Sequence, residues 1–237
     1  MFEVYGMSYE QLKVATQVDV RKEIQSSKYV VFDGVEKNGL RVLFVGNSIT
    51  LHEVNKNIGW YNTWGMAASA KEKDYVHLCI RHIRQYDPCA LFGICQVGEW
   101  ERKYQDGDST LCLFEAARNF TADVIVVKLG ANCPHENFYA GRFKNCFASL
   151  MEYLNKTGHA KVIVASEFYR HPSEEILKEY AEDMGYIFVS LSDLGERPEM
   201  RALGLFEHEG VANHPGDLGM AHIAQRLCEA LDVILSE

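Results

Sequence analysis

The sequence contains no apolar run that reaches the roughly 18 residues of a membrane-spanning helix. Its N-terminus lacks the basic start and apolar centre that mark a secretory signal peptide. Positive charge is not in excess either: the formal net charge is −9, which disfavours binding to a nucleic acid. From these absences we expect a cytoplasmic protein with no membrane span and no nucleic-acid partner.

Motifs for metals and phosphates are missing as well. The seven cysteines include no C-x-x-C pair, and their odd number and scattered spacing indicate reduced thiols. His208-Glu209 is not followed by a second histidine one helical turn later, because Ala212 stands there, and Gly210 and Pro215 argue against a helix. Neither G-x-G-x-x-G nor G-x-x-x-x-G-K-[ST] occurs. We therefore expect no metal and no cofactor.

What the chain does have is a regular alternation of short apolar runs and helical periods. Strands are predicted at 42–45, 91–97, 123–129, 161–166 and 186–190. Helices are predicted at 66–85, 111–120, 138–154, 173–184 and 217–235. This alternation predicts the α/β class: a three-layer α/β/α domain with a flavodoxin-like parallel sheet of about five strands.

The predicted domain covers residues 40–237. Residues 1–39 are the least informative and are assigned to a short N-terminal extension, with an edge hairpin as one arrangement and a short strand at 29–32. Ser173 and Asp217 are expected to cap the helices that they precede. The long loop at 191–216 is of a length that is often functional.

Several polar and aromatic residues have more than one interpretation. Lys128 lies in an apolar strand and would extend to solvent or reach the substrate. Glu99 and Arg102 would form a surface ion pair or touch substrate. Three aromatic residues after the first central strand would line a pocket or pack against a helix: Trp60, Tyr61 and Trp64.

Three polar signals fall at strand ends or in the last loop. Ser48 follows the strand at 42–45, Asn132 follows the strand at 123–129, and His214 precedes the last helix. In an open α/β sheet, ligands bind beyond the carboxyl ends of the strands, so these side chains can meet there. A serine, a histidine and an amide can supply the nucleophile, the base and an oxyanion donor that ester hydrolysis needs. The G-x-S-x-G elbow is not the motif used, because Thr50 replaces its second glycine.

The order of three short motifs resembles the SGNH hydrolases, also called the GDSL-type lipase and esterase family. Gly46-Asn47-Ser48 is similar to the first family block, Gly130-Ala131-Asn132 to the third, and His214-Pro215 to the last. The likeness covers about residues 40–235. It implies a serine ester hydrolase with the fold of that family.

The resemblance also implies roles for individual residues. Ser48 would attack the acyl carbon, and His214 would act as general base and then protonate the leaving alcohol. The oxyanion would be held by the Ser48 backbone N–H, the Asn132 amide and the N–H of a glycine. Gly98 is our choice for that glycine, with Gly93 and Gly65 as the other options.

The sequence departs from the family pattern at the triad acid. The family usually places an aspartate three residues before the histidine, where this chain has Val211. Glu209, five residues before His214, is a candidate for the third member. Alternatively, a backbone carbonyl could orient the imidazole and leave a Ser–His dyad, as in some carbohydrate-acetyl esterases of the family. Both alternatives stay open at this point.

The function predicted from these residues is hydrolysis of a small-molecule acyl ester through an acyl-Ser48 intermediate. Acetylated carbohydrate is the first choice of substrate, by resemblance, and a lipid or thioester is the second. The missing aspartate keeps another class open, a degenerate member that binds a sugar or acyl ligand without turnover. The sequence makes no prediction of oligomeric state.

Overall fold

The computed structural model describes residues 28–34, 38–134, 138 and 140–236. Its centre is a six-stranded sheet in the order β1-β3-β2-β4-β5-β6. The strands are β1 Val30–Asp33, β2 Arg41–Gly46, β3 Leu91–Gln96, β4 Val124–Lys128, β5 Lys161–Ala165 and β6 Ile187–Val189. Strands β2 to β6 are parallel, as predicted, and β1 adds an antiparallel edge strand beside β3. Residues 1–27 and 35–37 of the predicted extension lie outside the described residues.

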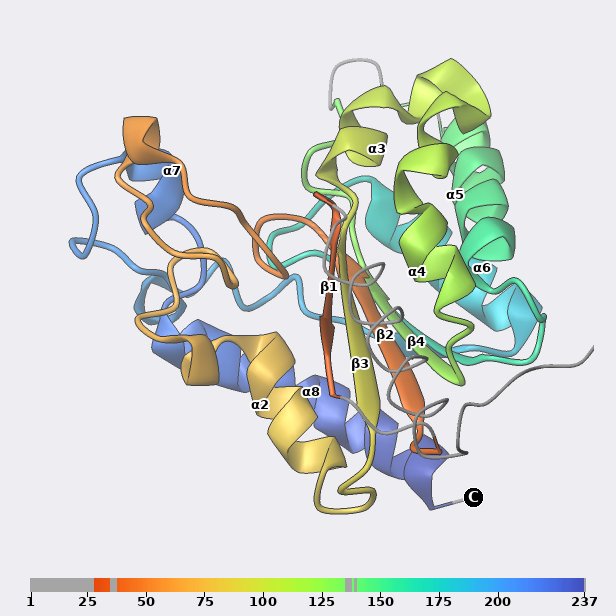
Figure 1. Cartoon of the computed structure of the whole chain (residues 1–237). Coiled ribbons are helices and arrows are strands. Elements are labelled where there is room, and N and C mark those ends of the chain that lie inside the picture. The colour runs from red at the N-terminus through yellow and green to blue at the C-terminus, as the bar shows by residue number, and fades with distance from the viewer. Residues whose placement is uncertain (1–27, 35–37, 135–137, 139, 237) are drawn as a thin grey trace, which may run out of the picture.

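The central strands are buried on both faces because helices cover both (Figure 1). Helices α2 (Tyr75–Ile83) and α8 (Asp217–Leu235) cover one face. The other face carries α3 Gly98–Lys103, η3 Tyr104–Phe114, α4 Glu115–Asn119, α5 Ala140–Leu154 and α6 Ser173–Met184. The predicted three-layer α/β/α arrangement is therefore confirmed. No helix in the described part of the chain is long and apolar enough to cross a membrane.

The register of the sheet decides where the polar turns lie. Gly46 at the end of β2 is aligned with Gln96 at the end of β3 and with Lys128 at the end of β4. Lys128 is in turn aligned with Ala165 at the end of β5. Because these four parallel strands end level with one another, the segments that follow them meet at a single edge of the sheet.

Two predicted helix caps were wrong. Ser173 is the first residue of α6, and the cap position belongs to Pro172. Asp217 is likewise the first residue of α8, after Gly216. Its carboxylate accepts hydrogen bonds from Ser69 instead, so it ties the start of α8 to the segment before α2. A carboxylate in the first turn of a helix is still favourable there, because it faces the positive end of the helix dipole.

Other boundaries also differ from the prediction. The helix predicted at 66–85 begins only at Tyr75, where the Asp74 side chain caps it, and a short η2 (Lys71–Lys73) precedes it. The predicted loop 191–216 contains η4 (Pro198–Met200) and a one-turn helix, α7 (Glu209–Ala212). The predicted absence of a helix near Gly210 was wrong, because a helix this short ends before Pro215 and tolerates a glycine. A further short helix, η1, spans Lys56–Ile58.

Candidate active site

Ser48 lies in a tight turn directly after β2. The Asn47 carbonyl accepts hydrogen bonds from the backbone N–H groups of Thr50 (2.9 Å) and Leu51 (3.0 Å). The Ser48 carbonyl accepts from the backbone N–H of Met66 at 2.9 Å, which ties the turn to the loop that follows it. The serine side chain is therefore held at the sheet edge by its own backbone and remains half-buried.

His214 reaches the serine from the other end of the chain. Its Nε2 lies 2.7 Å from Ser48 Oγ, although the two residues are 166 positions apart. Its Nδ1 lies 2.7 Å from the backbone carbonyl oxygen of Gly210 in α7. A carbonyl only accepts, so Nδ1 must carry the proton and Nε2 is free to accept the serine proton. The pair thus has the tautomer that general-base chemistry requires.

Glu209 does not occupy the place of a triad acid. Its side chain is exposed in the first turn of α7, and its backbone carbonyl accepts from Asn213. Val211, at the position where the family usually has its aspartate, is buried among apolar side chains. The position beside the Nδ1 of His214 belongs to the Gly210 carbonyl, so the geometry favours the dyad over the candidate third member.

Burial lowers the pKa of His214 from its usual value to about 4. The hydrogen bond to the Gly210 carbonyl opposes this effect, while the positive fields of His52 and Lys128 add to it. The imidazole is therefore neutral at physiological pH and able to accept a proton.

Asn132, which is predicted to help hold an oxyanion, lies on the other side of the candidate site. This residue follows Gly130, whose φ of +136° is a conformation that side-chain-bearing residues rarely adopt. Asn132, Ser48 and His214 line the same cavity. The Ser48 backbone N–H makes no hydrogen bond to another described residue, which leaves it available to a ligand.

The three candidate glycines are less free. The Gly98 N–H donates to the Gln96 side chain at 3.1 Å, so it could serve an oxyanion only by releasing or sharing that bond. Gly65 donates to Asp74 at 3.0 Å, and Gly93 lies within the ladder of β3. Of the three glycines, Gly98 still fits the predicted role best, because it is the first residue of α3 and lies at the same edge of the sheet as Ser48.

Beneath Asn132 lies a buried ionic cluster that the sequence did not point to, formed by Glu101, Glu167 and Lys128. All three side chains are at most 2% exposed. Lys128 donates to Glu167 at 2.5 Å, so neither of its predicted positions, solvent or substrate, was right. Glu101 accepts from Asn132 at 2.5 Å, and the Asn47 amide nitrogen lies between the two carboxylates, 3.1 Å from Glu101 and 2.6 Å from Glu167.

The two carboxyl groups of this cluster differ in pKa. Burial and the nearby charge of Glu167 raise the pKa of Glu101, against hydrogen bonds from Asn132, Gly130 and Asn47. For Glu167 the ion pair with Lys128 outweighs burial and holds the pKa below its usual value. Burial, assisted by both carboxylates, also raises the pKa of the neighbouring Cys133 thiol, which therefore stays uncharged.

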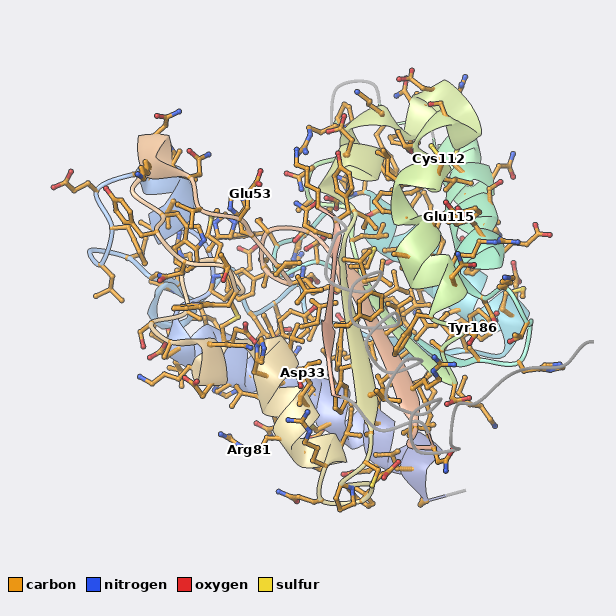
Figure 2. The ribbon with its side chains drawn as sticks, viewed as in Figure 1. Asp33, Glu53, Arg81, Cys112, Glu115 and Tyr186 are labelled. Atoms are coloured by element: carbon orange, nitrogen blue, oxygen red, sulfur yellow. The ribbon has the colours of Figure 1, made fainter. Side chains whose placement is uncertain are left out.

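The cavity at the site is polar on several sides. Glu99 and Arg102 line it, and Arg102 donates to the Glu99 carboxylate at 3.5 Å, so the predicted ion pair is present, while contact with a substrate stays a prediction. His52 and Glu53, in the loop after β2, line it as well. Figure 2 shows Glu53 on the loop side of the molecule, away from the helical layer that carries Cys112 and Glu115.

The aromatic residues after Ser48 mainly pack against one another. Trp60 is fully buried and makes an edge-on contact with Trp64, with ring centroids 6.1 Å apart. Phe206, from the segment before α7, lies at the same distance from Trp60. Tyr61 is exposed. This small apolar cluster joins the loop after β2 to the segment that leads to α7 and His214.

No family model matches the sequence, and no curated protein matches it. Solved structures do match its fold. One is a two-domain esterase active on acetylated mannans, at a TM-score of 0.53 and 16% identity, covering 84% of this chain and 50% of that one. Another is an active-site mutant of a family two carbohydrate esterase from Clostridium thermocellum, at a TM-score of 0.55 and 14% identity, covering 83% and 64%.

A third match is a putative lipolytic protein of the G-D-S-L family from Desulfitobacterium hafniense, at a TM-score of 0.50 and 13% identity. It covers 81% of this chain and 99% of the other. The chain thus spans between half and two thirds of the two esterases above but nearly the whole of this G-D-S-L protein. The resemblance predicted from the three motifs is confirmed at the level of structure: this chain has the SGNH-hydrolase fold.

Proposed function

We propose that the protein is a serine-dependent ester hydrolase with Ser48 as nucleophile and His214 as general base. The observation that carries this proposal is the pair of 2.7 Å contacts on the two imidazole nitrogens, to Ser48 Oγ and to the Gly210 carbonyl. The first is within the reach of proton transfer, and the second fixes the tautomer.

In the proposed reaction, Ser48 Oγ forms a bond to the acyl carbon while His214 Nε2 takes its proton. The developing oxyanion accepts hydrogen bonds from the Ser48 N–H and the Asn132 amide. Collapse breaks the ester C–O bond, and His214 returns the proton to the departing alcohol. Water, activated by the same imidazole, then releases the acid and restores Ser48.

Acetylated carbohydrate is the proposed substrate class. Support comes from two of the fold relatives, one active on acetylated mannans and one a carbohydrate esterase. A dyad oriented by a carbonyl also fits the pattern that some carbohydrate-acetyl esterases of this family use. A lipid or thioester hydrolase, and a binder without turnover, remain the alternatives that the experiment must separate.

The test is pre-steady-state hydrolysis of p-nitrophenyl acetate together with labelling by a fluorophosphonate. We expect a burst of about one p-nitrophenolate per chain and label on Ser48, with both lost in Ser48→Ala. Ser236→Ala, which removes an exposed hydroxyl at the end of α8, is the matched control and should behave as the wild type. Ligand binding with neither burst nor label would overturn the hydrolase in favour of a binder.

Substrate class is tested separately on the active enzyme. We expect faster acetate release from acetylated mannan or acetylated xylan than from long-chain p-nitrophenyl esters or acyl thioesters. The reverse order would replace the carbohydrate substrate with a lipid or thioester while leaving the roles of Ser48 and His214 in place.

A further inference from the structure

Glu101 is the buried acidic group that has no cation of its own. Lys128 donates to Glu167 at 2.5 Å, and within the described part of the chain no lysine or arginine contacts Glu101. The partners of Glu101 are three N–H donors: the Asn47 and Asn132 amides and the Gly130 backbone, the last at 2.5 Å. A buried charge is costly unless its oxygens are satisfied, so these three N–H groups, and not a cation, hold Glu101 against the segments that carry Asn47 and Asn132.

The contact between Glu101 and Asn132 determines which way the amide faces. An ionised carboxylate can only accept, so the nitrogen of Asn132, and not its oxygen, must lie against it. An amide nitrogen carries two hydrogens. One of them is bound to Glu101 Oε2, and the other is left for a group in the cavity that Asn132 lines.

Glu101 fixes the backbone of the same turn as well. Its Oε1 accepts from the N–H of Gly130, the residue with positive φ two positions before Asn132. Glu167 holds the residue between them, because its Oε1 accepts from the Ala131 N–H at 3.0 Å. The two carboxylates thus hold the backbone of this turn in place. Of the two, only Glu101 contacts both the backbone of the turn and the Asn132 side chain.

We propose that Glu101 is a positioning residue for the oxyanion site, which locks the Asn132 amide with one N–H aimed at the acyl oxygen. This inference rests on the proposed esterase function. It assigns no contact with substrate to Glu101, which acts through Asn132. Preorganised donors of this kind are the part of an active site that distinguishes the transition state from the ground state.

The test is a double-mutant cycle between Glu101→Gln and Asn132→Ala. Glutamine has one acceptor oxygen and one NH₂ group, so it cannot accept from both Gly130 and Asn132 in their present orientation. We expect Glu101→Gln to lower kcat on the order of 10- to 100-fold with little change in KM, the weight of a hydrogen bond to a charged group. Asn132→Ala should lower it about 10²–10³-fold.

In the Asn132→Ala background, Glu101→Gln should lower kcat by less than about threefold, because the amide that Glu101 positions has been removed. If Glu101 had only a structural role, Glu101→Gln would lower kcat by the same factor in both backgrounds, and that result would overturn the proposal. So would a folded Glu101→Gln enzyme with kcat within about twofold of wild type. Glu115→Gln, which changes an exposed side chain at the start of α4 (Figure 2), is the control and should leave kcat unchanged.

If Glu101→Gln does not fold, Glu101→Asp replaces it in the same cycle, since it keeps the charge but withdraws the oxygens by one methylene group. Its loss must again vanish in the Asn132→Ala background. The proposed function fails on a different result, the absence of burst and label in the wild type. An active wild type whose cycle is additive would reject only the role of Glu101.

Discussion

The two sides of the candidate site are built in opposite ways. On one side, Ser48 and His214 are half-buried and neutral, and a single backbone carbonyl orients the imidazole. On the other, Asn132 rests on a cluster of three charged groups that solvent does not reach.

The difference shows how much support each kind of group needs. A neutral imidazole has one tautomer to fix, and one acceptor fixes it. Two carboxylates and a lysine withdrawn from water each need polar partners, because each group left without one would cost several kcal/mol. Lys128 and Glu167 pair with each other, while Glu101 depends on surrounding N–H groups. The dyad side should therefore tolerate substitution around it, and the buried side should not.

Removing the cation of the buried side should have the strongest consequence for stability. Lys128→Met leaves Glu167 without its ion pair, and we expect a loss of about 3–5 kcal/mol in the free energy of unfolding, measured by urea denaturation. The matched control is Lys144→Met, which breaks an ion pair with Asp183 at the surface and should cost less than about 1 kcal/mol. If the two variants lost equal free energy of unfolding, the buried charges would need no more support than the exposed ones, and the comparison would fail.

Acidification should affect the buried side before the dyad. The pKa of Glu101 lies above its ordinary value and that of His214 lies at about 4, so Glu101 takes up a proton first as the pH falls. Protonation turns one of its acceptor oxygens into a donor, and protonation of His214 then removes the base. We expect kcat/KM to fall in two steps on the acid side.

The Glu101→Gln variant separates these steps. It should lose the upper step and keep the one near pH 4, because the pKa of His214 is set first by its own burial and by the Gly210 carbonyl, which the substitution leaves in place. The pH profile of kcat/KM for p-nitrophenyl acetate measures this. An upper step that survives in the variant would have to belong to another group.

The weakest effect is expected at Glu209, on the dyad side. Its exposed side chain does not touch His214, so Glu209→Gln should keep kcat/KM within about twofold of wild type. A triad acid replaced by its amide would lose on the order of 10⁴-fold, through the wrong tautomer. A loss of that size would restore Glu209 as the third member and remove the role of the carbonyl.

Much of the fold and half of the site follow from local patterns. Apolar runs such as Val124–Lys128 and the helical periods between them predict parallel strands with crossover helices. Because parallel strands end at one edge, the turns at Ser48 and Asn132 could be placed together before any coordinates were known. The prediction of Ser173 and Asp217 as helix caps failed, since a shift of one residue changes neither the composition nor the periodicity of a helix.

The candidate nucleophile, base and amide could be identified from the sequence because each is a distinctive side chain at the end of a strand or beside the last helix. The sequence did not reveal the groups that hold these three side chains in place. A backbone carbonyl such as that of Gly210 has no sequence signature. Glu101 cannot be told apart from Glu99, two positions earlier, by the sequence alone. Only the packing of α3 against the sheet sends Glu101 inward to Asn132 and leaves Glu99 at the cavity rim, because burial depends on the rotation of the helix and the surface it meets.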